Sequence, residues 1–132
     1  PASIPLPATS DGKYFAQIRK ASRTKNTVRI NFKLAGVSGQ RTITFEDTQI
    51  TITDKIAAKC DLLRLLVHHD VKLVQTTKQR LHTPNLGITF KADRNLVIDE
   101  TNHFTAAGSA RRVVAPHTDH VTLRICWGTD DV

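Results

Sequence analysis

The chain has 132 residues, a formal net charge of +7 and 39% apolar residues, which together match one ordinary domain over residues 1–132. No run approaches the roughly 20 apolar residues of a membrane helix, so we expect no membrane partner. Cys60 and Cys126 have no metal-site spacing and fit no disulfide-dense pattern, which favours two buried thiols in a reducing compartment. We predict no metal and no cofactor.

The positive charge is concentrated in the first third of the chain. Residues 1–41 contain eight basic residues and a single acidic one, Asp11, whereas residues 42–132 contain eleven of each kind. Cations gathered on one part of a sheet favour a polyanionic partner over a face that is merely solvated. Aromatic residues make up only 5% of the chain, so base stacking is not expected to be the main binding device.

The N-terminal third is predicted to be an arm followed by a hairpin. Three prolines within residues 1–12 exclude a helix and favour an extended arm. Tyr14 to Leu34 then reads as two strands joined by a polar turn. In the second strand, apolar and polar residues alternate: Val28, Ile30, Phe32 and Leu34 against Arg29, Asn31 and Lys33. Because neighbouring side chains of a strand point to opposite faces, one face is apolar and the other cationic.

A second β-rich segment follows a short turn at Gly36 and Gly39. It covers residues 41–53, and its apolar residues change parity in the middle. Either a bulge near Glu46 and Asp47 resets the register, or two short strands meet there.

The period of the apolar pattern then changes, which predicts the principal helix of the chain over residues 55–68. Asp54 offers an N-cap. Apolar positions recur at three to four residues: Ile56, Cys60, Leu63 and Leu66/Val67. A helix this apolar should pack against a sheet. The predicted fold class is therefore α+β, a mostly antiparallel sheet with one principal helix on one face, completed by a dimer partner.

The C-terminal half is predicted to consist mainly of strands. Residues 69–83 fit either a second helix or a strand, and Thr83-Pro84 breaks the chain. Strands are expected within residues 87–93, 96–98, 113–114 and 120–127. Residues 103–109 are expected to form a loop, and residues 128–132 a polar tail.

Histidine and aspartate cluster once, at His117, Asp119 and His120. Two imidazoles three residues apart with no third ligand nearby are a weak metal signal. No glycine-rich phosphate loop opens a helix, and no catalytic constellation can be seen in the sequence. We therefore do not expect an enzyme. A hydrolase with its site around these three residues is the rival from a different class.

Two segments of the chain resemble the coat proteins of small single-stranded RNA bacteriophages. QIRKASRTKNTVRINFKL is similar to the strand–turn–strand of that family, and ITITDKIAAKCDLLRLLVHHD is similar to the strand that leads into its helix. The resemblance covers roughly residues 13–70. It implies an antiparallel sheet with helices on one face and two subunits joined edge to edge. The opposite face would line the capsid interior and bind an RNA hairpin.

The resemblance also implies which side chains contact RNA. By position these are the polar members of the strands, and Lys20 is added because it follows Arg19 into the turn: Arg19, Lys20, Arg29, Asn31, Lys33, Thr42 and Thr44. The expected function is a viral coat protein that dimerises, assembles into an icosahedral capsid and packages single-stranded RNA. It would be found in the virion, and in the host cytoplasm during assembly. The alternative is a small basic RNA- or DNA-binding protein of the ribosome-associated type, acting as monomer or dimer.

Overall fold

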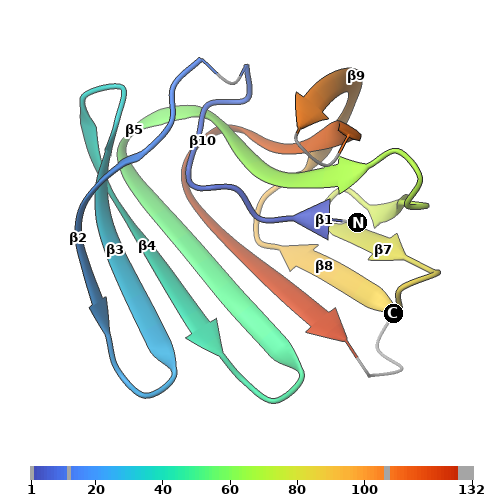
Figure 1. Cartoon of the computed structure of the whole chain (residues 1–132), viewed down its shortest axis with the longest axis horizontal. Coiled ribbons are helices and arrows are strands. Elements are labelled where there is room, and N and C mark those ends of the chain that lie inside the picture. The colour runs from blue at the N-terminus through green and yellow to red at the C-terminus, as the bar shows by residue number, and fades with distance from the viewer. Residues whose placement is uncertain (1, 12, 106–107, 128–132) are drawn as a thin grey trace.

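The structure, a computed structural model, describes residues 2–11, 13–105 and 108–127, and all regular elements in these ranges are strands (Figure 1). The strands are β1 (Ala2–Ser3), β2 (Gln17–Arg23), β3 (Thr27–Leu34), β4 (Val37–Phe45), β5 (Gln49–His68), β6 (Val74–Thr77), β7 (Arg80–Thr83), β8 (Ile88–Ala92), β9 (Val97–Thr105) and β10 (Gly108–Trp127). They form one antiparallel sheet in the order β2-β3-β4-β5-β10-β8-β7-β6. In addition, β1 pairs with β5 and β9 pairs with β10.

The prediction of an α+β fold is wrong, because the expected helix over residues 55–68 is part of β5. The described part of the chain contains no helix. Asp54, expected to cap that helix, lies inside the strand opposite Arg41 of β4 and Val121 of β10. Local helix propensity is a weak preference, and pairing along both sides of β5 overrides it.

The two longest strands explain the shape of the molecule. β5 and β10 each have 20 residues and bend together, so each strand belongs to two layers (Figure 1). Before the bend, residues 50–56 of β5 pair with β4; after it, β1 lies along residues 66–67. The β5–β10 register shifts twice at the bend, on either side of Thr118. Such irregularities let a strand turn a corner and change sheets.

The bend also produces the helix-like spacing that misled the sequence prediction. Ile52, Asp54 and Ile56 alternate into the interior as in an ordinary strand. Residues 57–59 are exposed at the corner, and residues 62–65 beyond it are all buried. Apolar residues therefore recur at three to four positions because the strand changes layer, although it never adopts a helical conformation.

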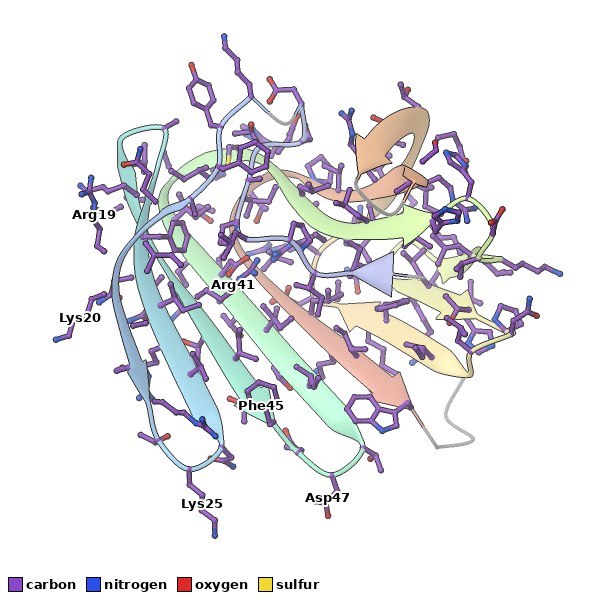
Figure 2. The ribbon with its side chains drawn as sticks, viewed as in Figure 1. Arg19, Lys20, Lys25, Arg41, Phe45 and Asp47 are labelled. Carbon is purple, nitrogen blue, oxygen red and sulfur yellow. The ribbon has the colours of Figure 1, made fainter. Side chains whose placement is uncertain are left out.

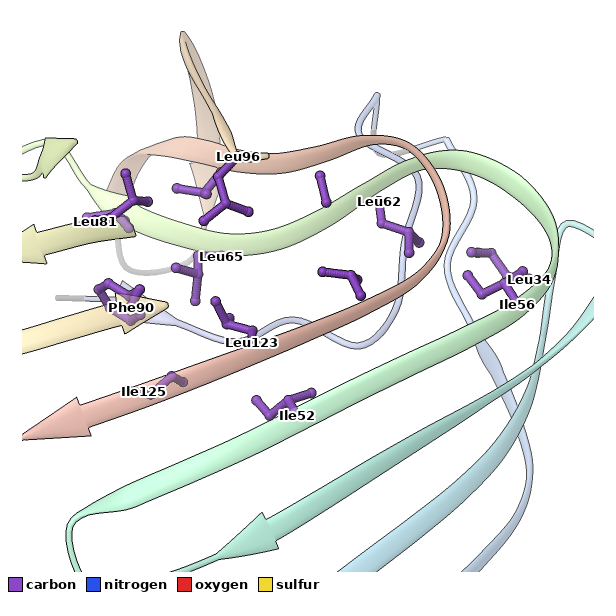
Figure 3. Packing of buried hydrophobic residues seen from close by; sticks show 14 of the residues in the cluster. Leu34, Ile52, Ile56, Leu62, Leu65, Leu81, Phe90, Leu96, Leu123 and Ile125 are labelled. Atoms are coloured by element: carbon purple, nitrogen blue, oxygen red, sulfur yellow. The ribbon is translucent and has the colours of Figure 1, made fainter. Parts of the chain in front are cut away.

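The hydrophobic core fills the space between the two layers (Figure 3). From the first layer come Ile52, Leu123 and Phe90; from the folded-back part of β5 come Leu62 and Leu65. Each of these five side chains is buried. Their burial supplies the main driving force for bringing together strands that are far apart in the sequence.

Several local predictions are confirmed, and others need correction. The hairpin of β2 and β3 is present, and β4 and β5 are two strands joined by a turn at residues 46–48 rather than one bulged strand. The turn after β3 uses Ala35 and Gly36, each with positive φ, whereas Gly39 lies within β4. Its Cα hydrogens face the ring of Phe32, and a Cβ there would meet that ring at 2.4 Å.

The remaining segments are more regular than expected. Residues 74–77 and 80–83 settle the open choice between helix and strand in favour of strands, and residues 113–114 and 120–127 are parts of the single strand β10. The loop expected at residues 103–109 is strand at residues 103–105 and 108–109. Within the N-terminal arm, residues 2–3 are strand, residues 6–7 form a bend and residues 10–11 a turn, and Thr9 bridges to Leu62 of β5. The predictions for residues 1, 12, 106–107 and 128–132 lie outside the described residues.

Candidate nucleic-acid interface

One side of the first layer carries only polar or cationic side chains over most of its width, and we call it the polar face. The pairing register places its cations on six strands of the sheet: Lys20, Arg29, Lys33, Lys55, Arg124, Lys91 and Arg80. Between them lie small polar residues, chiefly threonines: Ser38, Gln40, Thr27, Thr42, Thr44, Thr51, Thr53 and Thr122. The face is therefore a broad cationic surface.

No carboxylate occupies a paired position on the polar face. Asp54 belongs to the first layer but points into the interior. Glu46 and Asp47 lie in the turn after β4, at the end of the sheet (Figure 2). The balanced charge of residues 42–132 thus conceals a spatial separation, because four of their cations hold paired positions on this face and none of their described carboxylates does.

The structure brings the predicted RNA-binding residues together on the polar face, with the exception of Arg19. Arg29 lies opposite Thr42, Asn31 lies opposite Lys20, and Thr44 lies opposite Thr27. Lys33, opposite Gln17, completes the β3 row on the same face.

Arg19 is placed differently from the other predicted residues. It falls at a register shift between Ile18 and Lys20 and has no Cα partner on β3. Its guanidinium extends outward beside β2 (Figure 2), where Nη2 donates to Oε1 of Gln17 at 3.3 Å. Arg19 therefore belongs to the edge of the sheet rather than to the polar face itself.

Hydrogen bonds between strands hold the polar face in one arrangement. Nζ of Lys33 donates to Oγ of Ser38 at 2.9 Å, and Nε2 of Gln40 donates to Oδ1 of Asn31 at 3.1 Å. Farther along, the hydroxyls of Thr53 and Thr122 are 3.1 Å apart across β5 and β10. Cross-strand pairs of this kind stabilise a sheet and fix its side chains.

The cations at the centre of the polar face are available to a ligand. Arg29, Lys55 and Arg124 are exposed, and none of the three forms an ion pair with a carboxylate in the described part of the chain. An exposed cation without a counter-charge creates a positive potential, which neighbouring cations reinforce. The centre of the face therefore carries a positive potential.

Sequence reasoning found the β3 row but missed the far half of the face. Lys55 was assigned to a helix, and Lys91 and Arg80 were given no role. The sequence does indicate that Arg124 lies on a polar strand face, since it alternates with the apolar Leu123 and Ile125 within β10. Only the strand order shows that these four cations extend the surface begun by Arg29.

The histidine cluster lies at the corner where β5 and β10 change layer. His117 and Asp119 line a hollow of about 380 Å³ together with Lys59, Asp93 and Arg94. His120 is not among its lining residues. The hollow contains both charge signs, so it lacks the single-signed character of the polar face.

Two contacts account for the side chains around this corner. Nδ1 of His120 is 3.9 Å from Oδ2 of Asp93, and Oδ1 of Asp61 accepts the backbone N–H of His117 at 2.7 Å. His117 has a positive φ of 46°, an unusual conformation at a strand irregularity. Among residues 2–11, 13–105 and 108–127, no three side chains of His, Cys, Asp or Glu converge on a common point that could hold a metal ion.

Both thiols are free, and they differ in burial. Cys126 is buried, and its Sγ lies 3.6 Å from Oε1 of Gln49. Cys60 is half-buried beside the bend, and burial together with the charge of Asp61 raises the pKa of its thiol. A raised pKa keeps the thiol protonated, which makes Cys60 a poor nucleophile at neutral pH.

Comparison of the chain with protein-family models, curated proteins and solved structures gives no match. No helix within the described ranges is long and apolar enough to cross a membrane. The candidate interface is therefore defined by its own chemistry: cations in a regular array, hydrogen-bonding hydroxyls and amides between them, and no carboxylate at the paired positions.

Proposed function

We propose that this protein binds single-stranded RNA through the polar face. The observation that carries the proposal is the array of seven cations with no carboxylate at the paired positions of the same surface. Each cation that neutralises a phosphate releases condensed counterions, so binding gains a salt-sensitive free energy.

The shape of the polar face favours a single strand over a duplex. The grooves of a duplex are read by elements that protrude, such as a helix or a two-stranded ribbon. A broad sheet can instead accept a flexible strand whose phosphates settle on its cations. Exposed Asn31 and Gln40, together with the threonine hydroxyls, provide hydrogen-bonding groups for sugars and bases.

The coat-protein form of this function stays a prediction. The helix that the bacteriophage family packs over a partner's sheet corresponds to part of β5 here, so the resemblance now rests on the β2–β3 hairpin. In the described sheet the outer strand β6 has no neighbour on its far side, and a second subunit could extend this edge. Size-exclusion chromatography with absorbance at 260 and 280 nm tests this form: a nucleic-acid-rich particle supports a coat, and a monomer or dimer supports a small RNA-binding protein.

The binding proposal is tested by reversing charge at the centre of the polar face. In Arg29→Glu/Lys33→Glu, two cations of the polar face become carboxylates, one at the exposed Arg29 and one at the half-buried Lys33 of β3. The control is Lys59→Glu/Lys72→Glu, which makes the same change in net charge at two exposed positions away from the face. Binding of a labelled single-stranded RNA is measured by fluorescence anisotropy across a range of salt concentrations.

We expect the Arg29/Lys33 variant to bind more weakly and to show a shallower salt dependence. Losing two phosphate contacts should reduce the slope of log K against log salt by about 1.4, at about 0.7 per contact for a single strand. The control should keep the wild-type slope. Equal slopes in the two double variants would show that the polar face is not the binding surface.

A further inference from the structure

The outer strand β2 combines complete exposure with a row of cations. All seven of its residues are exposed, and its outer edge has no neighbouring strand in the described sheet. Along it, Lys20 lies opposite Asn31 and Arg23 lies opposite Val28, so these two cations project from the two faces of the strand edge. Arg19 falls at the register shift between Ile18 and Lys20, and Lys25 follows in the turn to β3. Figure 2 shows Arg19 and Lys20 extending from this edge and Lys25 projecting beyond the turn.

A hollow with aromatic walls lies at the start of β2. It has a volume of about 280 Å³ and is lined by Tyr14, Phe15, Gln17, Arg19, Lys33, Ala35 and Gly36. Tyr14 and Phe15 are 43% and 55% exposed, far more than aromatic rings in a core. Nζ of Lys13 lies 5.5 Å from the centre of the Tyr14 ring, so cations flank the aromatic pair on more than one side.

A second hollow with an aromatic wall lies at the other end of the same strand. It has a volume of about 370 Å³ and is lined by Arg23, Lys25, Asn26, Thr27, Val28 and Phe45. Phe45 is 47% exposed, and its backbone N–H donates to the carbonyl of Asn26 at 2.8 Å. That bond fixes Phe45 beside the β2–β3 turn. Each end of β2 thus carries an exposed aromatic wall and at least two cations. The first hollow lies on the side of Gln17 and Lys33, and the second on the opposite side, that of Val28 and Phe45, so a strand that reaches both crosses the edge of β2.

We propose that β2 is the track of a single-stranded nucleic acid, with one base held at each end. One base stacks on Tyr14 or Phe15, another stacks on Phe45, and the phosphates between them contact Arg19, Lys20 and Arg23. The seven residues of β2 span about 20 Å, which several nucleotides bridge. The inference rests on the proposed function and adds the path and the base contacts.

The chemistry of the edge fits this occupant better than it fits another protein strand. A second copy pairing with β2 across a two-fold axis would bring its row of cations against the first row, and like charges facing each other destabilise a strand pair. A single-stranded nucleic acid carries anions along its backbone and flat aromatic groups beside them. Stacking on aromatic side chains is tolerant of sequence and adds to the electrostatic term.

The few aromatic residues of the chain are unevenly distributed in the structure. Seven aromatic residues occur in the chain (five Phe, one Tyr and one Trp), and three of them lie at the two ends of β2. Aromatic residues are therefore rare in the sequence but grouped at this edge of the structure.

The test compares aromatic variants with an exposed apolar control. Tyr14→Ala/Phe15→Ala removes the aromatic wall of the first hollow, and Phe45→Ala removes the aromatic wall of the second. Leu86→Ala removes a side chain of similar exposure, 49%, from the β7–β8 turn, far from β2 in the strand order. Binding of labelled oligouridine of about ten nucleotides, within the range of single-strand site sizes, is followed by anisotropy in a salt series.

We expect each aromatic variant to bind about tenfold more weakly at every salt concentration, with the salt slope unchanged, because the rings contact bases rather than phosphates. Leu86→Ala should match the wild type. Phe15→Leu and Phe45→Leu keep an apolar side chain without the ring, so they should lose affinity while their thermal unfolding stays close to the wild type.

The outcomes separate the inference from the function on which it rests. If the wild type does not bind oligouridine or other single-stranded RNA, the proposed function is wrong and the inference falls with it. If the wild type binds and the aromatic variants bind as tightly as Leu86→Ala, the inference about β2 is wrong, and the proposal that the polar face binds RNA still stands. If Phe45→Ala changes the oligomeric mass without weakening binding, Phe45 belongs to a subunit contact and the track is overturned.

Discussion

Arginine has opposite roles on the two sides of the first layer. On the polar face, Arg29 and Arg124 are exposed and form no ion pair with a described carboxylate. In the interior, Arg41 and Arg64 are almost completely buried, and both bind the carboxylate of Asp54. The same residue type is thus offered to solvent on one side and enclosed on the other.

The interior network shows what a buried cation requires. Nε and Nη2 of Arg41 donate to Oδ1 and Oδ2 of Asp54, both at 2.8 Å, and Nη2 of Arg64 donates to Oδ2 at 2.6 Å. Nη1 of Arg41 donates to the carbonyl of Pro5 at 2.7 Å, which ties the N-terminal arm to the core. Figure 2 shows Arg41 pointing inward, whereas Arg19 and Lys20 point outward.

The difference in burial between these arginines separates charges that contribute to folding from charges that are available for binding. A buried charge is tolerated only when it is paired and hydrogen-bonded, since desolvation otherwise costs several kcal/mol. An exposed cation needs no such partner for folding, so it is free to bind a ligand. Variants on the two sides should therefore separate cleanly: interior changes affect stability, and polar-face changes affect binding.

The largest effect is expected from Asp54→Asn. The substitution keeps the size of the side chain but leaves two buried guanidinium groups without a carboxylate, which should cost about 3–5 kcal/mol of unfolding free energy. Chemical denaturation measures the loss. Asp47→Asn, in the exposed turn after β4, is the matched control and should unfold like the wild type. Equal stability of the two variants would show that the network contributes nothing to folding.

The same network predicts how stability depends on pH. Burial raises the pKa of Asp54, but the hydrogen bond from Arg41 and the charges of Arg64 and Arg41 outweigh burial and hold it below its ordinary value. A carboxyl with a depressed folded-state pKa stabilises the protein above its unfolded-state pKa, near 4, and the contribution disappears as the pH falls through the folded value. Stability should therefore fall on acidification below about pH 4. Asp54→Asn should lack this component of the acid transition.

A smaller loss is expected from Gly39→Ala, which tests packing on the apolar side of β4. The new Cβ would lie 2.4 Å from Cζ of Phe32, a ring that is only 2% exposed. Overpacking of this kind costs about 1–3 kcal/mol. Ser38→Ala, one residue away on the polar face, should change stability by no more than about 0.5 kcal/mol. Adding Phe32→Leu to Gly39→Ala should recover part of the loss, and no recovery would contradict the proposed clash.

The smallest effect is expected from Arg124→Glu, which asks how far the polar face extends in binding. One lost phosphate contact should lower the salt slope of RNA binding by about 0.7, with unfolding free energy unchanged within about 0.5 kcal/mol. Lys72→Glu, exposed and away from the face, should leave the slope unchanged. If Arg124→Glu behaves like Lys72→Glu, the binding surface does not extend as far as β10.

The hairpin and its two faces were predictable because their signals are local. Alternation from Val28 to Leu34 determines the sides on which Arg29 and Phe32 lie, whatever the rest of the chain does. The strand β5 was not predictable in the same way. Its partners β1 and β10 come from opposite ends of the chain, and its bend turns a two-residue period into a spacing that resembles a helix.

The sequence by itself determined the polarity of individual strands and the excess of positive charge, since both follow from composition and alternation. Only the tertiary structure decided that Arg80, Lys91 and Arg124 extend the surface of Arg29, and that Phe15 and Phe45 stand at the two ends of one strand. The physical reason is that strand order depends on how apolar faces far apart in the chain are buried together, and no local pattern records which faces will meet.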